Sequence, residues 1–199
     1  MTETSGTTIR AFIAIKLPAE VKAAVAIMQD SLKRAVGTKL VRWTAPEQIH
    51  LTLRFLGNIA VETVPELGAA LRRAGAQIAP FELRAAGLGC FPDEKRPRVL
   101  WVGLGGALEK LQELQKAVLA ETETWGETED RPFHPHLTLG RTKTTQPREL
   151  QALGPAIRAL LATDWGSWQV RGVNLMKSEL SPEGARHTSL LDVPLAGFR

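Results

Sequence analysis

The 199-residue sequence contains a single cysteine, Cys90, and no tyrosine. One cysteine excludes a disulfide within the chain and favours a reducing compartment such as the cytoplasm. No apolar run approaches the roughly 20 residues that a membrane-spanning helix needs. The opening residues, MTETSGTTIR, lack the basic stretch and apolar core typical of a secretory signal. We therefore expect a soluble, cytoplasmic protein that does not engage a membrane.

The composition is that of a globular protein, with 44% hydrophobic and 23% charged residues. A chain of this length can bury roughly 70% of its unfolded surface, so its core needs neither a metal ion nor a disulfide. The formal net charge of +4 would help to attract a phosphorylated partner or a nucleic acid. Many globular proteins carry a similar charge merely as a solvated surface, so charge alone does not choose a function.

Hydrophobic residues switch repeatedly between a period of two and a period of 3.6, which predicts a mixed α and β fold. The order of strand, helix, strand, strand and helix occurs twice, with no long linker between the two runs. We expect residues 1–8 to form a flexible tail and residues 9–199 to form one domain of two related lobes. Strands are predicted at 10–17, 39–43, 50–57, 81–91, 98–104, 136–141, 168–180 and 187–195, and helices around 21–32, 64–74, 108–119 and 150–160.

The tetrapeptide His-Leu-Thr-Leu occurs twice, at residues 50–53 and 136–139, nearly half the chain apart. In a strand, alternate side chains face opposite sides, so the leucines of each copy face a core. The histidine and threonine of each copy share the other face, about 7 Å apart. A single copy would be best explained as a strand with one face in water. Two copies with the same flanking leucines favour a chemical function.

Two such strands, brought together, place two imidazoles and two hydroxyls around one point. At neutral pH one imidazole can accept a proton, while the other, if protonated, can donate one. On opposite sides of a phosphorus atom, the pair suits in-line displacement, one serving the attacking oxygen and the other the departing oxygen. The threonine hydroxyls can donate hydrogen bonds to the non-bridging oxygens, where charge develops. We expect such a site to need no metal ion and no cofactor.

Two further histidines have other interpretations. His134 shares the face of His136 at a spacing of two residues, which raises the alternative of a metal pair. No acidic or cysteine cluster accompanies it, and Pro135 suits the entry to a strand, so we predict no metal site. His187 is interpreted as a residue of the surface or of the edge of the site.

The segments WTAPEQIHLTLRFLG and FHPHLTLGR resemble the two signature motifs of the two-histidine phosphoesterases. Within this superfamily the sequence is most similar to the RNA 2',3'-cyclic phosphodiesterases, also called 2'-5' RNA ligases. RAFIAIKLP near the start and LMKSELSPEGARHTSLLDVPL near the end resemble the same branch, so the resemblance covers nearly the whole chain after residue 8. It implies an α+β fold of two pseudo-symmetric lobes, each with an antiparallel sheet facing a central cleft and helices outside.

The resemblance also implies a reaction, the hydrolysis of a terminal 2',3'-cyclic phosphate of RNA to a 2'-phosphate. The reverse reaction would join two RNA ends through a 2'-5' linkage. His50 would be the proton donor and His136 the proton acceptor, while Thr52 and Thr138 would hold the phosphate. Arg141 matches a family arginine near the phosphate or its nucleoside. The implied partner is RNA with a cyclic phosphate end; no obligate protein partner is implied, and we expect a monomer.

The sequence departs from the family pattern at its C-terminal end, where members often have a tyrosine and this chain has His187. Phe12 on the first strand is a candidate for a face on which the substrate stacks. Arg54 is a candidate for attracting RNA, since strict alternation places it on the face of the first-motif histidine. Arg10 and Arg42 are weaker candidates for the same role.

Two other functions remain open from the sequence. The chain could bind RNA ends or nucleotides without turnover, although a binding module needs no pair of proton-transfer groups. It could instead be a phosphodiesterase for 2'-5' oligonucleotides or small cyclic nucleotides, because the same histidines would serve those substrates.

Overall fold

The computed structural model describes residues 7–37, 39–126, 132–144, 146–150, 153–159, 163–181 and 184–197. It confirms the predicted α+β fold. The strands are β1 (Thr8–Lys16), β2 (Val41–Trp43), β3 (His50–Ala60), β4 (Phe81–Phe91), β5 (Val99–Gly106), β6 (Leu137–Thr142), β7 (Asp164–Val170), β8 (Gly172–Ser181) and β9 (Gly184–Pro194).

The helices are α1 (Ala19–Val36), α2 (Val64–Ala76), α3 (Leu108–Glu121), α4 (Pro147–Leu150) and α5 (Leu153–Ala159), with single 3-10 turns η1 (Pro46–Gln48) and η2 (Val61–Thr63). Over the described ranges, none of these helices is long and apolar enough to span a bilayer.

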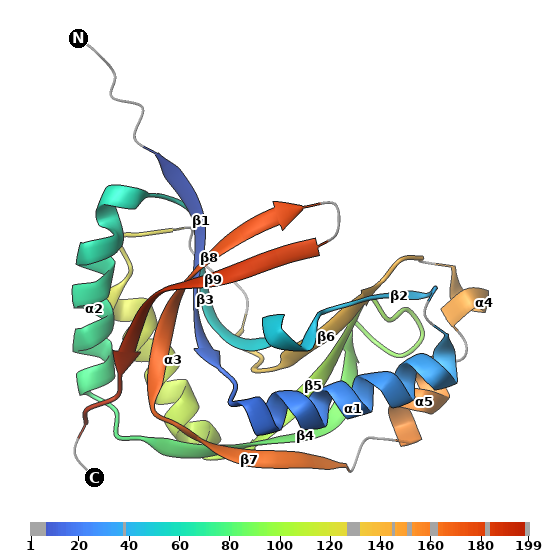
Figure 1. Ribbon diagram of the computed structural model, residues 1–199. Helices are drawn as coiled ribbons and strands as arrows, with labels where there is room; N and C mark the ends of the chain where they lie inside the picture. The colour runs from blue at the N-terminus through green and yellow to red at the C-terminus, as the bar shows by residue number, and fades with distance from the viewer. Residues whose placement is uncertain are drawn as a thin grey trace.

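The strands form one curled antiparallel sheet in the order β7-β4-β5-β6-β3-β1-β8-β9, and β2 pairs with β6 (Figure 1). The two His-Leu-Thr-Leu strands, β3 and β6, lie next to each other in the middle of this order. Only one residue pair, Leu51 with Leu137, joins them. The sheet therefore has two halves, β3-β1-β8-β9 and β7-β4-β5-β6 with β2 added to β6, and the repeated motifs lie on either side of the seam.

The helices are exchanged between the halves of the sheet. Helix α1 follows β1 of the first half, but it packs against β7 and α5 of the second half. Helix α3 follows β5 of the second half, but it packs against α2 and β3 of the first (Figure 1). Each half is thus covered by a helix from the other part of the chain, which fixes the two motifs relative to each other.

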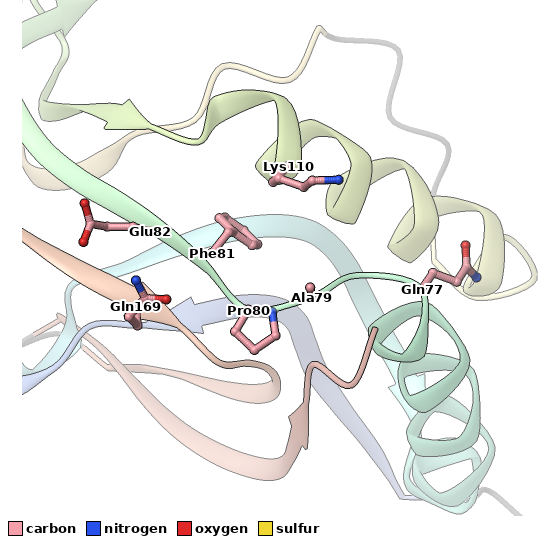
Figure 2. A pocket seen from close by; sticks show the side chains of 7 residues that line it. All are labelled: Gln77, Ala79, Pro80, Phe81, Glu82, Lys110 and Gln169. Atoms are coloured by element: carbon pink, nitrogen blue, oxygen red, sulfur yellow. The ribbon is translucent and has the colours of Figure 1, made fainter. Parts of the chain in front are cut away.

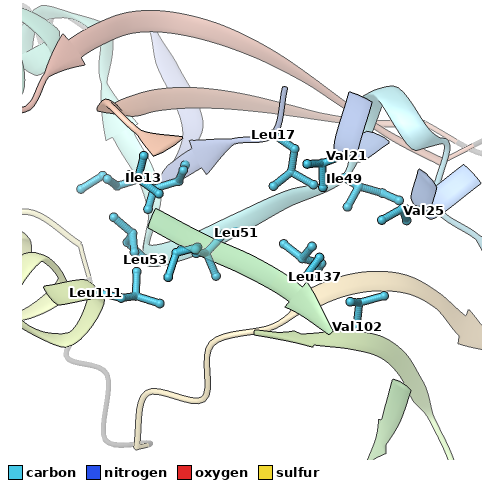
Figure 3. Packing of buried hydrophobic residues seen from close by; sticks show 14 of the residues in the cluster. Ile13, Leu17, Val21, Val25, Ile49, Leu51, Leu53, Val102, Leu111 and Leu137 are labelled. Carbon is cyan, nitrogen blue, oxygen red and sulfur yellow. The ribbon is translucent and has the colours of Figure 1, made fainter. Parts of the chain in front are cut away.

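The motif leucines anchor this arrangement. Leu51, Leu53, Leu137 and Leu139 are all fully buried in the main hydrophobic core. Figure 3 shows Leu51 and Leu137 side by side at the seam, and Leu53 directed toward Leu111 of α3. Burial of a leucine side chain contributes about 1.5–3 kcal/mol. The motifs therefore build the core on one face of the sheet and leave their polar residues on the other.

Several predicted boundaries differ from the structure. The predicted tail extended to residue 8, but Thr8 already pairs with Ala60 in β1, and residues 1–6 lie outside the described residues. The single helix expected at 150–160 is described as α4 and α5. The strand expected at 168–180 is divided at Arg171 into β7 and β8, because the chain there crosses from the β4 edge of the second half to β1 of the first.

Candidate active site

The two motifs bring His50, Thr52, His136 and Thr138 together at the seam of the sheet. Because Leu51 and Leu137 are direct antiparallel partners, each motif histidine is next to the threonine of the other strand. All four side chains are half-buried, and they lie opposite the face that carries the helices. We call this side of the sheet the histidine face. The positive charge of His136 is one of the causes that lower the pKa of His50, so the two imidazoles are electrostatically coupled.

Both motif histidines are held by a hydrogen bond to the backbone carbonyl oxygen two residues earlier in the chain. The Nδ1 atom of His50 lies 2.7 Å from the carbonyl oxygen of Gln48, and that of His136 lies 2.7 Å from the carbonyl oxygen of His134. Because a carbonyl oxygen only accepts hydrogen bonds, Nδ1 carries the proton in each ring. The Nε2 atom is then the nitrogen left for the substrate, as an acceptor in the neutral ring and a donor in the charged ring.

Burial dominates the electrostatics of the two imidazoles. Desolvation, and to a smaller extent the nearby charges of His187, Lys22 and His136, together lower the pKa of His50 to about 4. The hydrogen bond to the Gln48 carbonyl opposes this shift. Desolvation also lowers the pKa of His136, with the positive charge of Arg141 acting in the same direction. Both rings are therefore predominantly neutral at pH 7 in the free protein.

A β-bulge follows the threonine of each motif. On β3, Thr52 pairs with Ala14 and Arg54 with Ile13, so Leu53 has no partner on β1. On β6, Thr138 pairs with Trp101 and Gly140 with Leu100, so Leu139 has no partner on β5. The extra leucine reverses the alternation of the strand beyond it. The residue two places after each bulged leucine therefore returns to the histidine face.

The bulge on β3 turns Arg54 away from the histidine face, so its predicted role in attracting RNA is wrong. Arg54 is 4% exposed, on the side of the sheet that carries α3. Its guanidinium donates to the hydroxyl of Thr122 at 2.6 Å and to the carbonyl oxygens of Leu119 and Trp125 at 3.3 and 2.9 Å. These acceptors surround the C-terminal end of α3, where a cation is favoured. Arg54 stabilises that helix end.

The bulge on β6 has the opposite effect on Arg141. Strict alternation would place Arg141 with the buried leucines, whereas the structure exposes it and brings its charge close enough to affect His136. Arg42 of β2 is the direct cross-strand partner of Arg141 and is also exposed. Directly opposed side chains lie on the same face, and like charges in such a pair repel. An anion beside Arg42 and Arg141 would relieve that repulsion.

Phe12 does not have the exposed face predicted for it. The ring is only 2% exposed and belongs to a small buried cluster with Ala14 and Met176. Its centroid lies 4.7 Å from that of His50 and 4.9 Å from that of His187. Phe12 is therefore a buried ring that packs against the imidazoles of His50 and His187. The prediction that substrate stacks directly on it is wrong.

Two residues beside His50, Gln48 and His187, contribute to the site more than the sequence indicated. Gln48 holds the His50 ring through its carbonyl oxygen, and its side-chain oxygen accepts a hydrogen bond of 2.6 Å from the backbone N–H of His187. The His187 ring packs edge-on against His50, with centroids 5.0 Å apart. Desolvation lowers the pKa of His187. His187 thus forms part of the wall of the site.

Aromatic rings also surround His136. Its ring lies edge-on to Phe91, with centroids 5.0 Å apart, and 6.4 Å from Trp101. The indole of Trp101 occupies the space above Gly89, where an added Cβ would come within 2.2 Å of the ring. The glycine therefore allows Trp101 to lie flat against β4. The sequence signal was present, since Trp101 and Gly89 stand in neighbouring predicted strands, but the pairing register was not known.

A pocket of about 370 Å³ lies elsewhere, between the ends of α2 and β7 and the starts of β4 and α3. Figure 2 shows Gln77, Phe81, Lys110 and Gln169 among the residues that line it. None of the predicted site residues contributes to it, and it contains no histidine. In the part of the chain that the structure describes, no group of three or more histidine, cysteine, aspartate or glutamate side chains is arranged to hold a metal ion.

Comparison with known proteins shows that the chain is a phosphoesterase. The chain belongs to the family described as LigT like phosphoesterase, whose model matches residues 15–101 and 104–187. A curated relative from Thermus thermophilus, named RNA 2',3'-cyclic phosphodiesterase, is 36% identical over 195 residues, which are 95% of this chain and 91% of the relative.

Solved structures are similar over almost the whole chain. A crystal structure of a protein from Thermus thermophilus has a TM-score of 0.78 and 33% identity, covering 96% of this chain and all of that one. The structure of E. coli LigT complexed with 3'-AMP has a TM-score of 0.74 and 26% identity, covering 95% and 99% of the two chains.

Proposed function

We propose that the protein is an RNA 2',3'-cyclic phosphodiesterase, which opens a terminal cyclic phosphate to a 2'-phosphate. The observation that carries the proposal is the pair of imidazoles at the seam, each with Nδ1 bound to a backbone carbonyl and Nε2 left for substrate. The name of the Thermus thermophilus relative and the 3'-AMP complex of E. coli LigT support the same substrate class.

The proposed reaction uses one histidine on each side of the phosphorus atom. Nε2 of His136 accepts a proton from water as the water oxygen bonds to phosphorus. The bond from phosphorus to the 3'-oxygen breaks, and protonated His50 donates its Nε2 proton to that oxygen. The products are a 2'-phosphate and a 3'-hydroxyl. Thr52 and Thr138 donate hydrogen bonds to the non-bridging oxygens, where negative charge increases in the transition state.

The lowered pKa values place a condition on this reaction, because it needs one charged and one neutral imidazole. In the free protein both rings are predominantly neutral at pH 7. A bound phosphate favours the charged form of a neighbouring imidazole and raises its pKa. The substrate anion therefore shifts His50 toward its charged state, in which it can donate a proton. Because the rings interact, their titration belongs to the pair.

The remaining expectations concern partners and location. The partner is RNA with a cyclic phosphate end, and the reverse reaction would join a 5'-hydroxyl to that end through a 2'-5' linkage. The protein would act as a monomer in the cytoplasm, without a nucleotide cofactor, because the strained cyclic phosphate itself supplies the driving force.

The test is turnover of an oligoribonucleotide that ends in a 2',3'-cyclic phosphate, with chelator present. We expect the 2'-phosphate as product, and a loss of at least about 100-fold in kcat for His50→Ala and for His136→Ala. His134→Ala is the matched control, because it removes an exposed imidazole beside the site and leaves the carbonyl that holds His136. A 3'-phosphate product would contradict the assigned leaving group. Tight binding with no turnover would favour a binding module.

A further inference from the structure

Phe55 is an exposed aromatic residue on the histidine face that the proposed reaction does not use. It follows the bulge at Leu53 by two residues, and its side chain is 54% exposed. Its ring centroid lies 6.0 Å from that of Phe12, the buried ring that also supports His50. The rings of His50, Phe12 and Phe55 thus form a continuous row that leads away from the seam along the first half of the sheet.

Phe55 is held in place although its ring is exposed. It is the direct cross-strand partner of Phe12 on β1, and Phe12 in turn pairs with Met176 on β8. The flanking residues Arg54 and Leu56 are both buried, which fixes the backbone on both sides of the exposed ring. A rigid, exposed aromatic ring on a sheet is the type of surface on which nucleobases stack, whatever their sequence.

The distance from the phosphate subsite decides which base Phe55 can reach. Because of the bulge at Leu53, Thr52 and Phe55 pair with Ala14 and Phe12, which are two residues apart on β1 and therefore about 7 Å apart along the strand. The ribose of the terminal nucleotide carries the cyclic phosphate directly, so its base stays close to the histidines. The base of the preceding nucleotide is one phosphodiester further away and matches the position of Phe55.

A positive charge lies beside this ring. Arg10 is exposed on β1, two residues from Phe12 and therefore on the same face of the sheet. It pairs in register with Asn58, which is also exposed and lies just beyond Phe55 on β3. A cation next to a stacking ring suits the phosphate that follows a stacked base.

We propose that Phe55 is a stacking platform for the nucleobase that precedes the terminal nucleotide, with Arg10 beside the next phosphate. The substrate is then an oligonucleotide rather than a small cyclic nucleotide. This inference rests on the proposed function for the position of the reacting phosphate, and it adds a residue that selects for substrate length.

The experiment compares two substrates, a mononucleoside 2',3'-cyclic phosphate and a dinucleotide with the same terminal nucleotide and cyclic phosphate. We expect the wild-type protein to have the higher kcat/KM for the dinucleotide. Phe55→Ala should reduce this preference about tenfold and leave kcat/KM for the mononucleotide unchanged. Phe55→Trp, which keeps an aromatic face, should retain the preference.

Ile27→Ala is the matched control, since Ile27 is a 68% exposed apolar residue on α1, and it should change neither value. Melting temperatures show whether each variant is folded. An equal loss on both substrates for Phe55→Ala would overturn the assignment to the preceding base, as would no loss on either.

A binding measurement separates this inference from the proposed function. The dissociation constants of the corresponding 2'-phosphate mononucleotide and dinucleotide are compared in the wild-type protein and in Phe55→Ala. A dinucleotide-specific loss of affinity supports the platform even if the wild-type protein turns over neither cyclic phosphate, a result that would contradict the proposed function alone. Equal affinities for the two ligands in the wild-type protein would overturn the platform.

Discussion

At the scale of single residues, the two motif histidines differ from ordinary surface histidines because the fold keeps them neutral. His50 is the stronger case, since desolvation lowers its pKa to about 4. The tether to the Gln48 carbonyl stabilises the charged ring but does not outweigh burial. A site of this kind is ready to take up a proton together with an anion, because the anion compensates for the lost hydration of the imidazolium.

The titration of His50 therefore gives a prediction with two arms. In the free protein, the His50 ring should titrate near pH 4, well below the unfolded value of 6.5. With a saturating 2'-phosphate nucleotide, its pKa should rise by more than one unit. NMR titration of the histidine ring signals, assigned with His50→Gln, measures both values. An unchanged pKa on ligand binding would contradict the proposed role as the donor.

The same shift affects stability. The folded state binds fewer protons at His50 than the unfolded state between pH 6.5 and about 4, so this residue lowers stability as the pH falls through that window. Above pH 6.5 both states are neutral and the contribution vanishes. The wild-type protein should lose more stability than His50→Gln over this window, by up to about 3 kcal/mol.

At the scale of secondary-structure elements, the end of α3 depends on one buried guanidinium. We expect Arg54→Ala to lower the free energy of unfolding by about 3 kcal/mol, because the Thr122 hydroxyl and two carbonyl oxygens lose a charged donor. At a temperature where the variant is folded, its kcat/KM should be close to that of the wild-type protein.

Arg73→Ala is the control for this prediction. Arg73 contacts the same helix end through Glu121 at 2.7 Å, but its own side chain is 57% exposed, so the pair should contribute less than about 1 kcal/mol. Denaturant unfolding gives the two values. A large loss of activity in folded Arg54→Ala would indicate that this residue acts in the site after all.

The elements also show what could be predicted from the sequence. The alternation in His-Leu-Thr-Leu correctly placed four leucines in the core. It failed immediately afterwards, because the bulges at Leu53 and Leu139 depend on pairing with β1 and β5 and leave no local signal. Consequently Arg54 and Arg141 each lie on the face of the sheet opposite to the one that strict alternation predicts.

The error at Phe12, and the absence of any prediction for Phe55, have a related origin. A phenylalanine on a predicted strand can lie on either face, and the exposure of each ring depends on its neighbours in the sheet. Phe12 lies on the central strand of the first half and is covered by His50 and His187. Phe55 follows the bulge and has no comparable exposure signal in the sequence.

At the scale of the whole molecule, the effect of the net charge of +4 on RNA binding depends on where the positive side chains lie. Arg42 and Arg141 oppose each other on β2 and β6, on the side of the sheet that carries His136. We expect Arg42→Ala to raise KM for an oligonucleotide several-fold with little change in kcat. The slope of log KM against log salt concentration should fall by about 0.7, the value for one contact to a single-stranded phosphate.

Arg34→Ala is the control for this change. Arg34 is an exposed arginine on α1, so its removal alters the net charge equally without touching the histidine face. Kinetics at three or more salt concentrations separate the two variants. Equal slopes for Arg34→Ala and Arg42→Ala would show that RNA responds to the overall charge rather than to the arginine pair.

The exchange of helices has a consequence for the order in which the chain folds. Strand β1 leaves the ribosome first, yet it lies between β3 and β8, and its pairs with β8 form only after residues 174–177 have been synthesised. Helix α1 likewise waits for β7 and α5 before its apolar side is covered. Contacts of such long sequence separation slow folding and leave apolar surface exposed during synthesis. Neither half of the sheet can therefore be completed early in synthesis. One half needs β7, the other needs β8 and β9, and these are the last three strands of the chain.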